Sequence, residues 1–316
     1  MQGKLILCVN IVYNGCVIFM KCNLCSRKCN VDRDISVGIC GASNKIKVAR
    51  ASLHMWEEPC ISGDNGSGTI FFSYCNLQCI YCQNYELSKN HLGKEISVLE
   101  LSDICLDLQS KGANNINLVT PTHYVPEIIE ALKIAKSKGL SIPIVYNTSS
   151  YENIDTIKML DGIIDIYLPD LKYYDDYYAI NYSHVKDYFK VASQCIKEMY
   201  KQVGKPKFND DGIMTKGVIV RHLCLPGLKE DSKKILEYLY NTYHDDIYIS
   251  IMNQYTPVRK FNRFKNLNNL LSEDDYDEVI DYALDIGITK AFIQEGETQK
   301  ESFIPDFHQF EENKNT

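Results

Sequence analysis

The stretch "FFSYCNLQCIYCQNYELS" (residues 71–88) contains three cysteines, Cys75, Cys79 and Cys82, spaced C-x3-C-x2-C directly after an apolar run. A closed structural metal site usually takes four protein ligands, and a four-iron cluster normally takes four thiolates. A set of three leaves one coordination position open, and open positions are where chemistry occurs. We therefore predict a site whose fourth ligand is a substrate or cosubstrate. A structural zinc site and a set of inert buried thiols are the alternatives.

The pattern around this stretch predicts strands that alternate with helices. The expected strands are 69–74, 115–120, 142–147, 163–168, 217–225, 246–253 and 290–296. The expected helices are 97–112, 126–139, 152–160, 183–203, 230–241 and one beginning at Ser272. Such alternation is typical of a parallel sheet. It predicts an α/β protein, a full or partial β/α barrel of the TIM type, with its active site at the carboxyl ends of the strands.

Composition narrows the classes of function. The chain has 316 residues, 45% of them hydrophobic and 24% charged, and its net charge of −7 gives no reason to expect a nucleic-acid binder. The apolar run 5–20 is short for a membrane span, so we expect no membrane partner. Thirteen cysteines, seven of them in two short clusters, favour metal binding in a reducing cytoplasm over a disulfide framework.

We call Cys75, Cys79 and Cys82 the first cysteine set. A second cysteine set lies before it in the chain. Its members are Cys22, Cys25, Cys29 and Cys40, spaced C-x2-C-x3-C-x10-C. Four thiolates suit either a structural zinc ion or a second 4Fe–4S cluster, and Cys60 and His54 are alternative ligands. We divide the chain into four segments: 1–19, a cysteine-rich metal-binding module at 20–66, a barrel at 67–300 and a tail at 301–316. Residues 1–19 are equally well interpreted as an upstream extension or as part of the fold.

The C-x3-C-x2-C motif, with the aromatic Tyr81 before its last cysteine, resembles the radical S-adenosylmethionine (SAM) superfamily. The resemblance implies a 4Fe–4S cluster on Cys75, Cys79 and Cys82, whose open iron binds SAM. It implies reductive cleavage of SAM to a 5′-deoxyadenosyl radical that abstracts hydrogen from a substrate. It also implies a flavodoxin- or ferredoxin-type electron donor.

Further motifs narrow the resemblance. They are "CNLCSRKC", "GICG", "ARASLHMWEEPCISG", "SGTIFF", "CQNYELS", "NLVTPTHYVP", "YLPDLKYYD" and "VRHLCLPG", and together they look like the PflX-type proteins, similar to pyruvate formate-lyase activating enzymes. The resemblance does not supply the substrate. The first hypothesis is an oxidoreductase that abstracts hydrogen from a glycine of a glycyl-radical partner enzyme. A radical SAM enzyme that modifies another protein, a peptide or a small molecule is the alternative. A metal-binding module without turnover is the third reading, and the three-ligand motif argues against it.

The resemblance also indicates side chains that contact SAM at the strand ends. Activating enzymes carry a Gly-Gly-Glu stretch after the second strand, where this chain has "VTPTH" (119–123), so its polar side chains are expected to replace that contact. The "PDLK" stretch resembles the family's Asp-x-Lys motif, in which the lysine meets SAM and the aspartate helps to hold a monovalent cation. The predicted SAM-binding residues are Tyr81, Thr120, Thr122, His123, Asn147, Thr148, Asp170, Lys172, Arg221 and Asn253.

Alternative readings exist for several of these residues. Arg221 lies in an apolar strand, where it needs a partner, and a structural ion pair would satisfy it as well as a carboxylate of SAM. Asp170 and Lys172 could form an ordinary exposed ion pair, and His123 could be a solvated loop histidine.

Overall fold

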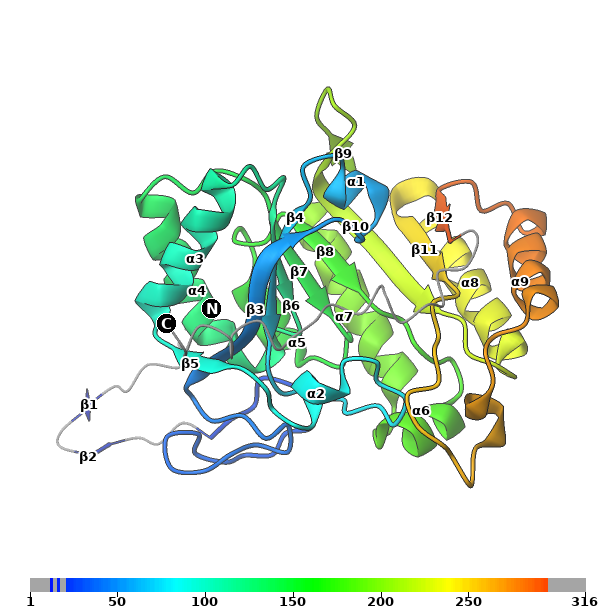
Figure 1. Ribbon diagram of the computed structural model, residues 1–316, viewed down its shortest axis with the longest axis horizontal. Helices are drawn as coiled ribbons and strands as arrows, with labels where there is room; N and C mark the ends of the chain where they lie inside the picture. Colours follow the sequence, from blue (N-terminus) through cyan, green and yellow to red (C-terminus); the bar gives the residue numbers. More distant parts are fainter. Residues whose placement is uncertain (1–11, 14–15, 18–20, 295–316) are drawn as a thin grey trace, which may run out of the picture.

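The computed structural model describes residues 12–13, 16–17 and 21–294. Within them, one ten-stranded sheet organises the molecule, and its main path runs in the order β12-β11-β10-β8-β7-β6-β4-β3-β5 (Figure 1). The strands are β3 (Ile46–His54), β4 (Ser67–Phe72), β5 (Lys94–Ile96), β6 (Ile116–Val119), β7 (Ile144–Thr148), β8 (Ile166–Pro169), β9 (Lys207–Phe208), β10 (Met214–Leu223), β11 (Tyr248–Met252) and β12 (Ala291–Ile293). Strands β1 (Val12–Tyr13) and β2 (Cys16–Val17) pair separately with each other.

Strands β4, β6, β7, β8, β10, β11 and β12 run parallel, whereas β3, β5 and β9 pair antiparallel with their neighbours. No pairing among the described residues joins β12 to β5, so the sheet is an open, partial barrel. This confirms the predicted fold class.

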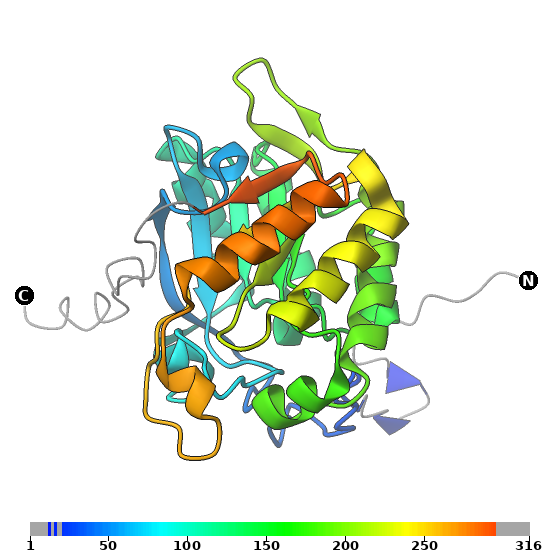
Figure 2. The same cartoon turned by 90° about the vertical axis from the view of Figure 1, so that its right-hand side faces the viewer.

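Helices cover the outer face of the sheet, and α8 and α9 lie side by side over its β10–β12 end (Figure 2). The helices are α1 (Pro59–Ser62), α2 (Tyr85–Ser88), α3 (Val98–Ser110), α4 (Val125–Ser137), α5 (Ile154–Met159), α6 (Asp176–Ser183), α7 (Tyr188–Val203), α8 (Lys229–Tyr243) and α9 (Glu273–Asp285). Short 3-10 turns occur at Thr122–Tyr124, His244–Asp246 and Lys265–Asn268.

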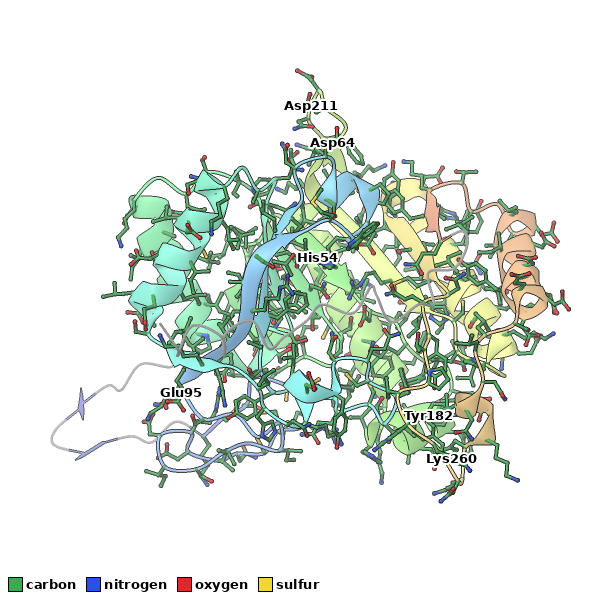
Figure 3. The ribbon with its side chains drawn as sticks, viewed as in Figure 1. His54, Asp64, Glu95, Tyr182, Asp211 and Lys260 are labelled. Atoms are coloured by element: carbon green, nitrogen blue, oxygen red, sulfur yellow. The ribbon has the colours of Figure 1, made fainter. Side chains whose placement is uncertain are left out.

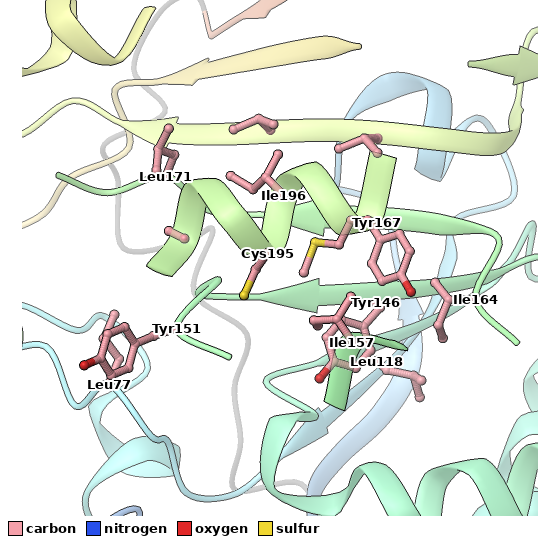
Figure 4. Packing of buried hydrophobic residues seen from close by; sticks show 14 of the residues in the cluster. Leu77, Leu118, Tyr146, Tyr151, Ile157, Ile164, Tyr167, Leu171, Cys195 and Ile196 are labelled. Carbon is pink, nitrogen blue, oxygen red and sulfur yellow. The ribbon is translucent and has the colours of Figure 1, made fainter. Parts of the chain in front are cut away.

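The core forms on both faces of the strands because their side chains alternate. On the outer face, Tyr146 and Tyr167 pack with Ile157 and Ile196 beneath the helices (Figure 4). On the inner face, a smaller apolar cluster fills the start of the barrel. Its members are Cys60, Ile61, Val145, Ile166, Leu168, Met214 and Ile219. Helix α1, which supplies two of them, therefore plugs the amino end of the barrel.

The two ends of the sheet differ in the segments they carry. Asp64 and Asp211 lie in turns at the end where β4 and β10 begin, whereas Tyr182 and Lys260 lie at the opposite end with α2 and α6 (Figure 3). Since parallel strands share a direction, their carboxyl ends meet at this second end of the sheet. The first cysteine set follows β4 there.

Several elements differ from the expected ones. The short strands β5 and β9 and the helices α1, α2 and α6 were not expected. The helix predicted at 183–203 is broken: α6 ends at Ser183 and α7 begins at Tyr188, because His184 and Asp187 adopt left-handed backbone conformations (φ 55° for both). Strand β3 was not expected, although it lies within the range 20–66 and pairs with β4. The metal-binding role of that range stays a prediction.

The ranges 1–19 and 301–316 lie outside the described residues, apart from β1 and β2. Among the residues that the structure covers, no helix is long and apolar enough to cross a membrane.

His222 connects β10 to its surroundings and makes stability dependent on pH. Its ring is 2% exposed, with Nδ1 2.8 Å from the Leu171 carbonyl oxygen and Nε2 2.8 Å from the Ser232 hydroxyl. The carbonyl can only accept, so Nδ1 carries the proton and Nε2 accepts from Ser232. Burial lowers the pKa of His222 to about 4.

We therefore expect the free energy of unfolding to fall as the pH falls from about 6.5 towards about 4, because only the unfolded chain binds the proton there; His222 contributes about 1.4 kcal/mol per pH unit. His222→Gln should make this slope shallower. Urea unfolding of both proteins at a series of pH values measures the two slopes, and equal slopes would contradict the assignment.

Candidate functional site

The loop after β4 holds the first cysteine set at the carboxyl end of the sheet. Tyr74 and Gln78 in this loop have positive φ angles (75° and 57°), a costly conformation for residues other than glycine that tends to occur at functional sites. All three sulfurs accept a hydrogen bond. The donors are the Leu77 N–H to Cys75 (3.4 Å), the Ser183 hydroxyl to Cys79 (3.0 Å) and the Ser88 hydroxyl to Cys82 (3.5 Å). Hydrogen bonds of this kind stabilise a charged sulfur.

Burial dominates the acidity of two of these thiols, Cys75 and Cys82. Burial, together with the neighbouring Cys79 and Cys82, raises the pKa of Cys75 to about 12. Burial also raises the pKa of Cys82, and the Lys172 ammonium opposes this rise. Cys75 and Cys82 are therefore protonated near neutral pH without a metal, and metal binding must release their protons.

A buried ionic network occupies the ends of β7, β8 and β10. Arg221 Nη2 lies 2.9 Å from Asp170 Oδ1 and donates to Asn147 Oδ1 at 2.7 Å, while Lys172 Nζ lies 2.7 Å from Asp170 Oδ2. Burial alone would raise the pKa of Asp170, but Arg221 and Lys172 outweigh it and lower this pKa. Burial alone would lower the pKa of Lys172, but Asp170 and then Cys79 raise it. The structure thus brings four of the predicted residues together and places the lysine within electrostatic reach of the first cysteine set.

Sequence reasoning missed two members of this network, Glu57 and Glu58, which precede α1. Glu57 Oε2 lies 3.5 Å from Arg221 Nη1. Burial raises the pKa of both glutamates, and Arg221 opposes that rise. The sequence did indicate that an arginine within a strand needs a charged partner. Nothing in the local sequence identifies Glu57 and Glu58 as the carboxylates that pair with Arg221.

Two predicted hydroxyls are bound to another carboxylate that the sequence did not reveal. Glu152 Oε1 accepts from Thr122 Oγ1 at 2.6 Å, from Thr148 Oγ1 and from Tyr146 OH at 3.3 Å. Burial raises the pKa of Glu152 to about 7, although the three hydroxyls act to lower it. Thr122 and Thr148 therefore support a buried carboxyl group rather than present free hydroxyls.

Thr120 directly follows β6 and also has a positive φ (59°), and its N–H donates to the Asn147 carbonyl. His123 is 3% exposed, so the alternative reading as a solvated histidine is wrong. Its Nε2 donates to the Ser73 carbonyl at 2.8 Å, and burial lowers its pKa to about 3. His123 is therefore a neutral ring packed beneath the first cysteine loop.

The remaining two predicted residues lie at the same end of the barrel. Tyr81 is 4% exposed, and its hydroxyl is 2.7 Å from the Tyr173 hydroxyl. Asn253 follows β11, and its backbone N–H donates to Gln294 Oε1 at 3.0 Å.

Two sulfurs of the second cysteine set lie against Gly38. A methyl group at Gly38 would lie 3.2 Å from Cys29 Sγ and 3.3 Å from Cys40 Sγ, so both sulfurs point at this residue. Burial raises the pKa of Cys22, and the neighbouring Cys29 and Cys40 raise it further. Cys60 instead lies in the inner apolar cluster of the barrel.

Across the described part of the chain, no three His, Cys, Asp or Glu side chains are arranged as direct ligands of a single metal ion.

Comparison with known proteins agrees with this site. The model of the Radical SAM superfamily matches residues 69–239, more than half of the chain. The chain therefore belongs to the radical SAM superfamily. Membership implies an enzyme that uses a 4Fe–4S cluster and SAM, and it confirms the resemblance at the level of the superfamily.

An uncharacterized protein of Methanocaldococcus jannaschii, MJ0674, is 28% identical over 279 residues, which cover 84% of this chain and 75% of that protein. Streptococcus suis SuiB bound to SAM is 15% identical (TM-score 0.48), with 76% of this chain and 53% of that chain covered. A domain of pyruvate-formate lyase-activating enzyme from Bacteroides vulgatus is 16% identical (TM-score 0.40), with 54% and 92% covered. The chain thus spans about half the length of SuiB.

Gly38→Ala tests the geometry of the second cysteine set. The added methyl group should push Cys29 and Cys40 apart and reduce the iron plus zinc bound per chain, because the glycine backbone lies against both sulfurs. Metal analysis of the purified proteins measures the change. Ser36→Ala, an exposed position in the same loop, is the matched control and should keep the full metal content. Full metal content in Gly38→Ala would show that the set does not bind metal as a unit.

Proposed function

We propose that this protein holds a 4Fe–4S cluster on Cys75, Cys79 and Cys82 and cleaves SAM reductively, and that the resulting radical abstracts a hydrogen atom from a substrate. The observation that carries the proposal is a set of three buried or half-buried cysteines at the carboxyl end of β4 in a radical SAM chain, each with a sulfur that accepts a hydrogen bond. Three thiolates suit a cluster with one open iron. When bound, the cluster supplies the electron that splits the sulfonium of SAM into methionine and a 5′-deoxyadenosyl radical.

The protein's own residues bind and orient SAM beside the cysteines. Lys172 is suited to a carboxylate because its ammonium lies at the strand ends and near Cys79. Asn147 and Arg221 offer donors on the neighbouring strands. A monovalent cation at Asp170, which the family resemblance implies, would have to share the two oxygens that already bind Lys172 and Arg221.

For the substrate, we propose a glycine of a glycyl-radical partner enzyme, supported by the PflX-type motifs. The "VTPTH" stretch in place of Gly-Gly-Glu is a departure from true activating enzymes. Incubation with a candidate partner and detection of a glycyl radical by electron paramagnetic resonance tests this choice; without such a signal, a different protein, peptide or small molecule becomes the substrate class.

Three further assignments accompany the proposal. The second cysteine set binds either zinc or a second 4Fe–4S cluster, since four thiolates suit both. A flavodoxin- or ferredoxin-type protein supplies the electrons. The protein functions in the cytoplasm, because clustered free thiols need a reducing compartment.

Cys79→Ala tests the site directly. The variant should lose the cluster and give no 5′-deoxyadenosine after anaerobic reconstitution with dithionite and SAM, because two thiolates cannot replace three. Cys75→Ala and Cys82→Ala should behave in the same way. Cys105→Ala, which removes a buried thiol of α3 that belongs to neither cysteine set, is the control and should retain both the cluster and the cleavage. Cleavage at the normal rate by Cys79→Ala would refute the assignment.

Lys172→Ala tests the SAM contact. We expect at least about tenfold weaker SAM binding with unchanged iron content, because one charged hydrogen bond contributes about 1.5–3 kcal/mol. Equilibrium binding to the reconstituted protein provides the measurement. Lys229→Ala is the matched control. It removes a lysine that also pairs with carboxylates, Asp275 and Glu278, but on the surface between α8 and α9, and it should leave SAM binding unchanged. An unchanged binding curve for Lys172→Ala would exclude this role.

A further inference from the structure

A chain of three buried hydroxyl groups ends on the Cys79 sulfur. Tyr173 OH lies 2.7 Å from both Tyr81 OH and Ser183 Oγ, and Ser183 Oγ lies 3.0 Å from Cys79 Sγ. The three side chains are 4% exposed or less. We call Tyr81, Tyr173 and Ser183 the hydroxyl chain. The other two sulfurs of the set receive single and longer hydrogen bonds, at 3.4 Å and 3.5 Å.

Counting protons fixes the direction of the hydrogen bond to Cys79. Each hydroxyl has one proton to donate, and a thiolate that binds a metal has none. Cys79 can then only accept, so the Ser183 proton points at its sulfur. The Ser183 oxygen is then free to accept from Tyr173, because either atom of that pair can donate. With the Tyr173 proton on Ser183, two protons point towards Cys79, and hydrogen bonds aligned in this way polarise one another.

The backbone holds Ser183 in this position. It is the last residue of α6, and its carbonyl accepts a hydrogen bond at 3.1 Å from Arg27 Nη2. Tyr173 packs edge-on against Tyr182 and Tyr188, with ring centroids at 6.3 Å and 5.4 Å. The donor to Cys79 is therefore fixed before any metal binds.

We propose that Ser183 is a positioning residue that raises the reduction potential of the cluster at Cys79, and that Tyr173 strengthens its hydrogen bond. The inference rests on the proposed function. A reduced cluster carries one more negative charge than an oxidised one, so a donor at its thiolate sulfur stabilises the reduced state. The chain thereby makes the cluster easier to reduce while leaving its open position untouched.

The test is a redox titration of the reconstituted full-length protein, monitored by electron paramagnetic resonance. The signal that changes when SAM is added identifies the cluster at Cys75, Cys79 and Cys82. Ser183→Ala should keep its iron and shift the midpoint potential downwards, so that the ratio of reduced to oxidised cluster at a fixed potential falls about threefold or more. Tyr173→Phe keeps the Ser183 hydroxyl and removes its donor, so it should give a smaller shift in the same direction. Ser183→Thr, which retains a hydroxyl, should recover most of the potential.

Ser88→Ala is the matched control, because it removes a longer hydroxyl contact to Cys82 that no second hydroxyl supports. If Ser88→Ala lowered the midpoint potential as much as Ser183→Ala does, the special role of the hydroxyl chain would be refuted. An unchanged potential in Ser183→Ala with full iron content would refute the proposal outright. If Ser183→Ala loses its cluster, an unchanged potential in Tyr173→Phe refutes it instead. Absence of any cluster in the unmodified protein would overturn the proposed function itself.

Discussion

The positive charge of Arg221 lies inside the curved sheet, and its neutralisation determines how the strand ends are arranged. An isolated buried charge is very costly, and breaking a buried pair by removing one partner costs about 3–5 kcal/mol. The register of the sheet meets this need, because β8 and β10 place Asp170 directly beside Arg221. Asn147 from β7 accepts another of its hydrogen bonds. Three adjacent strands are thereby held together by one side chain.

The charge of Arg221 also explains why the segment between β3 and β4 carries a buried carboxylate. Glu57 approaches Arg221 from this segment, and Cys60 and Ile61 of α1 fill the apolar start of the barrel. One short segment therefore plugs the amino end of the barrel and extends carboxylates towards its polar end.

Local patterns predicted much of this arrangement. The alternation of strands and helices predicted the parallel sheet. The helix expected at 97–112 is α3, which begins after Ser97, and a capping box of Ser97 and Glu100 holds its first turn. The C-x3-C-x2-C motif gave the end of β4. The antiparallel strand β3 was missed because its pairing with β4 is a tertiary contact within a cysteine-rich region. The break after Ser183 was missed because left-handed His184 and Asp187 carry no glycine-like signal.

Buried partners were harder to predict than strand ends. Arg221, Asp170 and Lys172 were expected to be polar groups of one site, and their proximity follows from the common carboxyl end of parallel strands. Glu152 and Glu57 come from loops whose paths depend on packing, so sequence spacing could not assign them to Thr122 or to Arg221. The same limit applies to Ser183, which reaches Cys79 from 104 residues along the chain.

Arg27 connects the two cysteine sets physically. It lies between Cys25 and Cys29, and its guanidinium donates to the carbonyls of Asn76, Leu77, Ser183 and His184. Two of these carbonyls belong to the first cysteine loop, and the other two lie at the carboxyl end of α6, where the helix dipole favours a cation. A ligand that binds only the ordered form of a segment stabilises that form. Metal at the second set would therefore hold Arg27 in place, and with it both the loop that presents Cys75 and Cys79 and the backbone that positions Ser183.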